Sequence, residues 1–269
     1  SAVLPLEDEE VSVLMARELK KRGVDVRTGT TIEGAQVRDG LVVAQLKDGS
    51  TVEAEMLLVS IGRGFQSRDI GAEQAGVALG RRGEILVDDR METNVPGVYA
   101  IGDVVGKAML AHVASAQGKV AVENIMGHPT KIRYDVIPAG IFTLPEVGRV
   151  GLTERQAREQ AQAAGHDPEQ AVKVGRFRYA ALGKAQATGD ITGLFKVIAD
   201  AATGRLLGAH IVGAHAADLI HEAALAMETG ATVLQIAHMI HAHPTLAEGF
   251  LEAVEDVEGC AIHQMKKKS

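Results

Sequence analysis

His241-Ala242-His243-Pro244-Thr245-Leu246-Ala247-Glu248 is the stretch of this sequence that says most about its fold and chemistry. In it, His243 precedes a proline and stands five residues before Glu248. A carboxylate that reaches an imidazole holds one tautomer and makes the ring a stronger base. On spacing alone, however, a histidine at a helix entry and a solvated glutamate are the better interpretation, so the surrounding motifs decide.

The bulk composition predicts a globular chain. Of its 269 residues, 46% are hydrophobic and 23% are charged. The sequence has no uncharged apolar run long enough for a membrane span. A net charge of −7 argues against a nucleic-acid partner, since phosphate binding needs a basic face. The single cysteine, Cys260, cannot form an intrachain disulfide, which fits a reducing compartment, and we expect a cytoplasmic protein.

Residues 1–65 are expected to form one helix and several strands. Asp8 is a helix N-cap followed by acidic residues, and Gly23 ends the helix. A short strand is expected at residues 24–27, followed by a meander with Asp-Gly turns at residues 39–40 and 48–49. Residues 56–61 are a continuous apolar run, which predicts a strand buried on both faces and ending at Gly62.

Residues 66–133 contain Gly97-Val98-Tyr99-Ala100-Ile101-Gly102-Asp103, which predicts a short strand ending in Gly-Asp. An acidic residue at such a strand end commonly binds a ribose or ribityl hydroxyl. A helix rich in small residues is expected from about His112 to Met126, and these residues would allow a backbone or a flat ligand to come close. A strand-end aspartate that only caps the next turn is the simpler alternative for Asp103.

Residues 134–269 are expected to form a separate α+β unit. The strands are predicted at residues 142–151, 172–178, 193–199 and 206–212. The helices are predicted at residues 153–164, 216–229, 233–241 and 246–257. Thr153 and Gln156 match a capping box, and Gly230 is placed to end the second helix.

Four stretches together resemble the pyridine nucleotide–disulfide oxidoreductases. Ile61-Gly62-Arg63 and the Tyr99–Asp103 motif mark the superfamily, whereas Met109-Leu110-Ala111-His112 and His241–Glu248 are similar to its dihydrolipoamide dehydrogenase branch. The resemblance covers essentially the whole chain. It implies an α/β and α+β fold in three parts. These are the second half of a Rossmann-like NAD-binding domain (1–65), a central FAD-contacting segment (66–133) and a C-terminal α+β dimerisation domain (134–269).

The resemblance implies roles for the histidine motif. His243 would be the base that takes a proton from a thiol of dihydrolipoamide, because the thiolate attacks a disulfide. Glu248 would orient the imidazole and stabilise its charged form. In the family this histidine reaches the active site of the partner subunit of a homodimer. The other implied partner is a lipoyl-bearing protein of a 2-oxoacid dehydrogenase complex. A cis His243-Pro244 peptide bond is also expected.

The same resemblance implies a cofactor site. Asp103 would bond the ribityl chain of FAD, and Met109, Leu110, Ala111 and His112 would line the flavin. Gly62 would allow NAD to approach closely, and Arg63 would face a phosphate or solvent. Here the sequence departs from the family, because Gly64-Phe65 stands where relatives often carry Arg-Pro.

Three family features are absent from the sequence: both glycine-rich fingerprints and the Cys-x-x-x-x-Cys pair. We therefore expect that the chain alone neither binds FAD tightly nor transfers electrons. The alternatives are a sister flavin disulfide reductase, a soluble transhydrogenase and, for the isolated chain, a non-catalytic dimerisation module. His238, His241 and His243 lack a further ligand at suitable spacing, so no metal site is expected.

Overall fold

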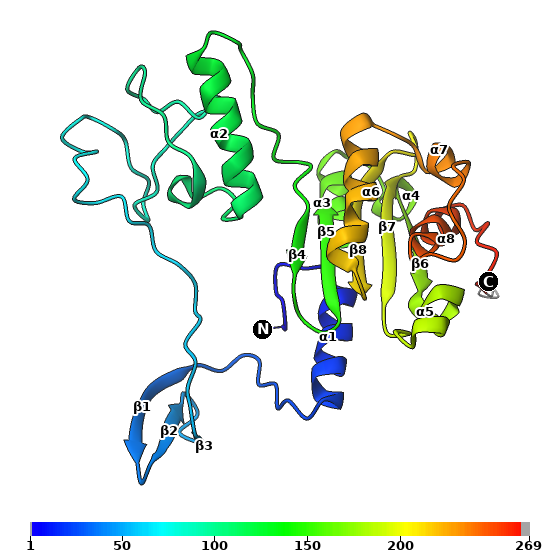
Figure 1. Ribbon diagram of the computed structural model, residues 1–269, viewed down its shortest axis with the longest axis horizontal. Coiled ribbons are helices and arrows are strands. Elements are labelled where there is room, and N and C mark those ends of the chain that lie inside the picture. Colours follow the sequence, from blue (N-terminus) through cyan, green and yellow to red (C-terminus); the bar gives the residue numbers. More distant parts are fainter. Residues whose placement is uncertain (1, 265–269) are drawn as a thin grey trace. The chain divides into compact units, whose positions relative to one another are not determined.

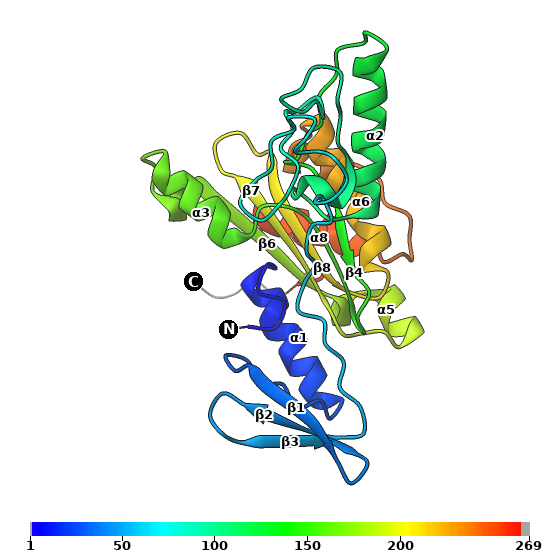
Figure 2. The same cartoon turned by 90° about the vertical axis from the view of Figure 1, so that its left-hand side faces the viewer.

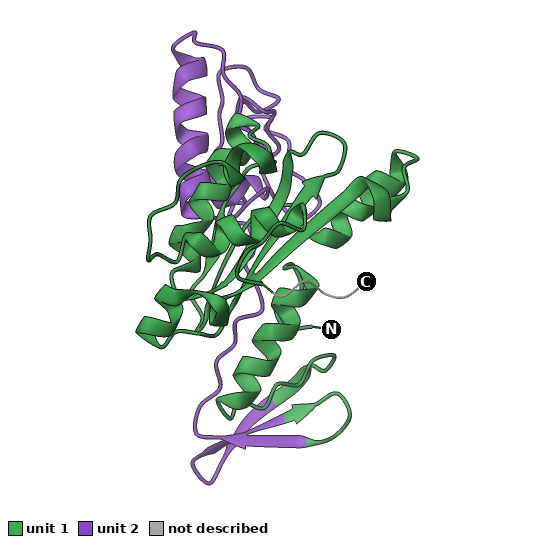
Figure 3. Cartoon of the chain, turned by 90° about the vertical axis from the view of Figure 1, so that its right-hand side faces the viewer, with its two compact units in different colours: residues 1–34, 45–50, 136–269 green, residues 35–44, 51–135 purple. Residues whose placement is uncertain are grey.

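The structure is a computed structural model that describes residues 2–264 (Figure 1). The chain divides into two compact units, which Figure 3 shows in different colours. One unit comprises residues 1–34, 45–50 and 136–269, and the other comprises residues 35–44 and 51–135. The mixed α/β class agrees with the fold expected from the sequence. The division into three domains stays a prediction.

The first unit is built on a five-stranded antiparallel sheet of order β4-β5-β8-β7-β6. Its strands are β4 (Ala139–Ile141), β5 (Glu146–Gly151), β6 (Val172–Arg178), β7 (Leu194–Asp200) and β8 (Leu206–Gly213). The three longest strands agree with the prediction to within about one residue at each end, because each is a run of apolar and β-branched residues bounded by turns.

One face of this sheet carries the main core. Alternate residues of β7, such as Phe195 and Val197, are fully buried against helices α6 (Ala216–Thr229), α7 (Val233–Ala237) and α8 (Glu248–Val257). Figure 2 shows the helices and strands of this unit from the side. Successive strand residues point to opposite faces, so Lys196 and Ile198 belong to the other face.

The opposite face is covered by α1 (Glu9–Lys21) and α3 (Glu154–Ala163). Val11 and Met15 of α1 pack on Val147 and Val212, and Ala157 of α3 packs on Ile198. The predicted caps are confirmed. Asp8 accepts a hydrogen bond from the Glu10 N–H, and Thr153 and Gln156 form a capping box. The smaller helices of this unit are α4 (Pro168–Ala171), η2 (Tyr179–Ala181) and α5 (Gly183–Thr188).

A second sheet, of order β1-β2-β3, follows α1 in the chain and spans the boundary between the units. Its strands are β1 (Ile32–Arg38), β2 (Leu41–Leu46) and β3 (Thr51–Ala54). Both Asp-Gly turns are where the sequence predicts them. Asp39 and Gly40 have φ values of 49° and 83°, as a two-residue hairpin turn requires.

The rest of the second unit holds η1 (Gly102–Val105) and α2 (Ala111–Ile125). α2 agrees with the predicted helix to within one residue. Its buried residues Val120 and Ala121 pack on Met91, which gives this unit a small core of its own.

Three strand predictions are wrong. Residues 56–61 form no strand, and all of them are exposed, because a strand buried on both faces needs neighbours that the described residues do not supply. Residues 24–27 also form no strand, because no described segment pairs with them. The predicted strand at residues 97–103 is one bridge between Glu92 and Tyr99 followed by η1.

Three element limits also differ from the prediction, each near a proline or a loop. The strand expected at residues 142–151 starts at Glu146, because residues 143–145 form a bend and Pro145 has no N–H to donate to a neighbouring strand. The helix expected at residues 233–241 ends at Ala237, and the next begins at Glu248 instead of Leu246. The loop between them is therefore longer than expected, and it carries His243. Within the described residues, no helix is long and apolar enough to cross a membrane, and no cluster of ligand-type side chains suits a metal ion.

Candidate active site

The loop between α7 and α8 holds the histidine motif. The predicted cis peptide bond between His243 and Pro244 is confirmed. Just after it, the Thr245 hydroxyl donates to the Ala242 carbonyl oxygen (2.7 Å), and the Thr245 N–H donates to Glu248 Oε2 (2.8 Å). The loop thus folds back on itself and places His243 beside the first turn of α8.

His243 and Glu248 are hydrogen-bonded through Nδ1 and Oε1 at 2.8 Å. Since a carboxylate oxygen accepts, Nδ1 carries the proton and Nε2 of a neutral ring keeps its lone pair. The His243 side chain is 75% exposed and that of Glu248 is 24% exposed, so the glutamate is the sheltered partner. The pair presents an exposed ring nitrogen that can accept a proton.

The environment of Glu248 keeps it ionised. Burial works against its charge, but the Thr245 N–H and the His243 ring both bond the carboxylate, and their combined effect lowers the pKa of Glu248. A carboxylate that stays charged can stabilise an imidazolium ion on His243. The geometry therefore suits a general base.

Helix α8 fixes the position of Glu248. The helix buries Phe250, Ala253 and Val254 against the sheet. It also lies very close to β6 at Gly175, where an added Cβ would stand 1.9 Å from the Ala253 carbonyl oxygen. Glu248 is the first residue of α8, so this packing sets where its carboxylate stands.

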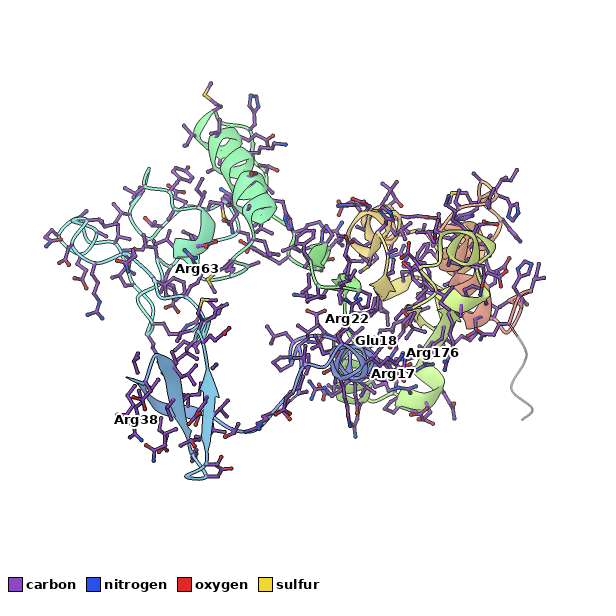
Figure 4. The ribbon with its side chains drawn as sticks, turned by 60° about the horizontal axis from the view of Figure 1, so that its bottom comes forward. Arg17, Glu18, Arg22, Arg38, Arg63 and Arg176 are labelled. Carbon is purple, nitrogen blue, oxygen red and sulfur yellow. The ribbon has the colours of Figure 1, made fainter. Side chains whose placement is uncertain are left out.

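In the second unit, Arg63 of the Gly62-Arg63 motif lies near Asp103. Arg63 Nε is 3.8 Å from Asp103 Oδ2, and both side chains are exposed (Figure 4 labels Arg63). Gly62 has a φ of 118°, a backbone conformation that favours glycine. Asp103 lies in η1, and the N–H of Gly102 just before it donates to Gln117 Oε1 of α2 at 2.6 Å. The structure thus brings the Gly62-Arg63 motif to the Asp103 motif.

The residues Met109, Leu110, Ala111 and His112 form the N-terminal end of α2. Leu110 is the N-cap and supplies no side-chain cap, and the other three residues are exposed. The start of η1 lies beside α2 at ordinary van der Waals distance. An added Cβ on Gly102 would stand 3.6 Å from Ala114, and one on Gly118 would stand 3.5 Å from Ile101.

Sequence reasoning missed one pair in the histidine motif. His241 Nε2 bonds Glu222 Oε1 of α6 at 2.7 Å. The two residues are 19 positions apart, so no helical or strand spacing relates them. Of the two residues, only His241 lies in one of the four stretches that carry the resemblance, so the partner on α6 is seen first in the structure.

Large apolar side chains are exposed on the first unit. Ile240, next to His241, is 96% exposed. Others on this unit include Phe142, Leu144, Leu225, Leu234 and Met239. A contiguous group of exposed apolar side chains is typical of an interaction surface.

Two family models match the chain. Residues 137–254 match the dimerisation domain of the pyridine nucleotide-disulphide oxidoreductases, and residues 1–118 match a pyridine nucleotide-disulphide oxidoreductase model. The chain belongs to the pyridine nucleotide-disulphide oxidoreductases. The expected resemblance is confirmed by sequence relatives within this family, which are named dihydrolipoyl dehydrogenase.

This oxidoreductase chain is 43% identical to the dihydrolipoyl dehydrogenase of Thermus scotoductus, over 98% of the chain and 57% of that protein. It is 40% identical to the enzyme of Geobacillus stearothermophilus, over 97% of the chain and 54% of the enzyme. The human mitochondrial dihydrolipoyl dehydrogenase is also 40% identical, over 91% of the chain and 48% of that protein. The chain therefore spans about half the length of the curated relatives it matches.

Solved structures of flavoprotein disulfide reductases share the fold. LpdA of Mycobacterium tuberculosis matches with a TM-score of 0.85 and 27% identity, over 94% of this oxidoreductase chain and 54% of that one. The HOCl-induced flavoprotein disulfide reductase RclA of Escherichia coli matches with a TM-score of 0.84 and 26% identity, over 94% of this chain and 56% of that one.

Proposed function

We propose that the chain is the C-terminal part of a dihydrolipoyl dehydrogenase. The intact enzyme oxidises dihydrolipoamide through FAD and a redox disulfide and reduces NAD+. The observation that carries this proposal is the hydrogen bond between His243 Nδ1 and Glu248 Oε1, which leaves Nε2 exposed on the ring. The identity to dihydrolipoyl dehydrogenases over nearly the whole chain supports it.

His243 acts on the thiol of the substrate. Nε2 takes the proton of the S–H group, which leaves a thiolate, and the ring becomes an imidazolium ion that keeps its bond to Glu248. The thiolate is the species that attacks a disulfide sulfur. Glu248 stabilises the positive ring while the proton is held, since its carboxylate stays ionised.

The residues present fit a flavin site. Asp103 offers an exposed carboxylate at the start of η1, and α2 begins at Ala111 without a side-chain cap. A carboxylate such as that of Asp103 accepts hydrogen bonds from hydroxyl groups. The N–H groups at a helix N-terminus can donate to electron-rich ring oxygens. When bound, FAD would supply the electron-accepting ring system; Gly62 would give NAD close access, and Met109–His112 would line the flavin.

The working form is a homodimer. The exposed apolar side chains on the first unit, including Phe142 and Ile240, would be covered by a second copy, and the match to a dimerisation domain supports this arrangement. His243 would then serve the active site of the partner subunit. The physiological substrate is a lipoyl-bearing protein of a 2-oxoacid dehydrogenase complex in the cytoplasm.

The isolated chain acts as a dimerisation module without redox activity. The glycine-rich fingerprints that hold FAD and NAD and the reactive cysteine pair are absent from the sequence. Light scattering should give the mass of a dimer, and visible absorption should show no flavin. A monomer would contradict the first statement, and a full complement of yellow flavin would contradict the second.

The base is tested by His243→Ala in the intact enzyme. We expect turnover of dihydrolipoamide to fall about 10²- to 10⁴-fold, the usual contribution of a general base. Oxidation of NADH by an artificial acceptor should be largely retained, because that reaction needs no thiol proton. His238→Ala, in the same segment, is the matched control. Equal loss of both activities in His243→Ala would refute the role of His243.

A further inference from the structure

We propose that His241 and Glu222 form a positioning pair that fixes the loop carrying His243. The catalytic meaning of this pair rests on the proposed function, but the structural role can be tested without it. The pair is distinct from His243 and Glu248, because it joins the loop to a different helix, α6.

The His241 ring is held at both nitrogens. Nε2 is 2.7 Å from Glu222 Oε1, and Nδ1 is 3.1 Å from the Met239 carbonyl oxygen. Both partners are acceptors, so both bonds form when each ring nitrogen carries a proton. A bond from such a ring to a carboxylate is charge-assisted and is among the stronger hydrogen bonds in proteins.

Burial separates the roles of the two histidines. The His241 side chain is 4% exposed, whereas that of His243, two residues later, is 75% exposed. A buried ring with both nitrogens bonded has no position from which to exchange a proton with a substrate. His241 therefore acts as an anchor, and His243 is the ring that is presented.

Helix α6, which carries Glu222, is held firmly on the sheet. α6 packs on the sheet through Ile220 and Ala223, both essentially buried. At Gly148 of β5, an added Cβ would stand 2.2 Å from the Ala216 carbonyl oxygen, so α6 lies directly against the strand. Glu222 cannot shift along the sheet without breaking this packing.

The loop is thus tied to a carboxylate on each side. Glu222 of α6 holds it at His241, and Glu248 of α8 holds it at His243 and Thr245. Burial and the charge of Glu252 raise the pKa of Glu255 of α8, and the nearby His241 ring opposes part of this rise. Loss of the first tie leaves only bonds within the loop and to α8 to hold the His243 ring in place.

The test measures hydrogen exchange by NMR in the 269-residue chain, because the Thr245 N–H bonds Glu248 and reports on the loop. We expect exchange at Thr245 to rise about tenfold in His241→Ala, the factor that corresponds to about 1.4 kcal/mol. Amides of β7 and β8 should keep their protection. Glu222→Gln keeps the shape of the side chain but not its charge and should give a smaller rise. His238→Ala is the control and should change nothing.

Two outcomes decide the inference. Unchanged exchange at Thr245 in both His241→Ala and Glu222→Gln overturns the positioning role, whatever the enzyme does. A loss of protection that extends to β7 and β8 in both variants also overturns it, because the pair would then support the whole fold.

Activity separates this inference from the proposed function. In the intact enzyme, His241→Ala should lower kcat for dihydrolipoamide about tenfold and leave KM unchanged, since a misplaced base still binds substrate. If exchange rises at Thr245 while His243→Ala leaves turnover intact, the positioning pair stands and the proposed function fails. If His243→Ala is inactive but the exchange is unchanged, the reverse holds.

Discussion

Lys196 and Asp8 form an ion pair at 2.8 Å in which each side chain is 2% exposed. The lysine is in the middle of β7, and the aspartate caps α1, 188 residues earlier. The same ammonium group also bonds Glu10 (2.7 Å) and Glu154 (2.8 Å). One buried cation thus joins α1 and α3 to the sheet.

Lys196 belongs to a row of basic side chains that crosses the sheet. Strand register places Arg176 opposite Lys196, Lys196 opposite His210, and His210 opposite Arg149. Burial lowers the pKa of His210, so the like charges that stand directly opposite each other are those of Arg176 and Lys196, and such a pair destabilises a sheet unless other groups compensate. Here acidic side chains cover the row, and Figure 4 shows Arg176 beside α1. The covering residues are Glu7, Asp8, Glu10 and Glu154.

Replacement of Lys196 by methionine should destabilise this unit. Lys196→Met keeps most of the side-chain volume but leaves Asp8, Glu10 and Glu154 facing one another without their shared cation. Removing one partner of a buried ionic cluster costs about 3–5 kcal/mol. Urea unfolding at pH 7 measures the loss. Lys173→Met, which removes an exposed partner of Glu258, is the control and should cost under about 1 kcal/mol. Equal effects of the two variants would show that burial of the cluster contributes nothing.

Acid should release α1 from the sheet. Burial opposes the charge of Asp8, Glu10 and Glu154, but bonds to cations prevail and lower the pKa of each. The main cation is Lys196 for Asp8 and Glu154, and Arg176 followed by Lys196 for Glu10. A lowered carboxyl pKa means stability that is present above the unfolded value, about 4, and is lost as pH falls through the folded value. The protection factors of the α1 amides in hydrogen exchange, which correct for the intrinsic rate at each pH, should therefore fall below about pH 4, before those of β7. Simultaneous opening of both elements would contradict this order.

The sequence predicts the local role of Asp8 but not its distant partners. A capping aspartate and two acidic residues in the first turn are explained by helix electrostatics alone, and the cap is present. That Asp8 also bonds Lys196 depends on the register of β7 and the position of α1 on the sheet. A basic residue inside an apolar strand was the available signal, since lysine is rarely buried unless paired.

At residues 56–61, by contrast, the sequence predicted a strand that the structure does not contain. Five of these six residues are apolar, and such a run is typical of a buried strand. The pattern shows that the segment would be buried in a sheet, but it does not show whether partner strands are present. Without pairing strands among the described residues, the run stays exposed. The elements of the five-stranded unit were predictable because their partners lie within the same chain. The histidine motif was located by resemblance, whereas its link to Glu222 required the structure.

The lack of a side chain at Gly175 should determine how closely α8 packs on the sheet. A Cβ there would stand 1.9 Å from the Ala253 carbonyl oxygen, so Gly175→Ala pushes the helix and Glu248 away from the sheet. We expect a loss of about 1–3 kcal/mol, as for overpacking in a core. Gly183→Ala, where an added Cβ meets nothing within 4 Å, is the control. Thermal unfolding compares the two variants, and equal melting temperatures would contradict the close packing.

Glu248→Gln should weaken the base without removing it. The amide oxygen can still accept a hydrogen bond from the Nδ1–H of His243, but the NH2 group then takes the place of the oxygen that accepts from the Thr245 N–H, and the side chain carries no charge to stabilise the imidazolium ion. In the intact enzyme, we expect kcat for dihydrolipoamide to fall about 10- to 100-fold, less than for His243→Ala. Glu258→Gln, just beyond the end of the same helix, is the control. Wild-type turnover in Glu248→Gln would show that the carboxylate charge takes no part in the reaction.

Glu252 should hold the C-terminal segment in a pH-dependent way. Its Oε2 accepts the N–H groups of Ile262 (3.0 Å) and His263 (3.2 Å), and its Oε1 contacts the His263 ring. That bond raises the pKa of His263, and the nearby charge of Glu252 adds to the effect.

A raised histidine pKa means stabilisation that is complete below the unfolded value, about 6.5, and is lost as pH rises through the folded value. NMR titration should show His263 losing its proton at a higher pH than in Glu252→Gln, which removes the attracting charge but keeps the side-chain shape. The segment around Ile262 should loosen over the same pH range in the wild type. It should not do so in His263→Gln, where no ring titrates. If Glu252→Gln leaves the titration of His263 where it is in the wild type, the carboxylate does not hold the ring.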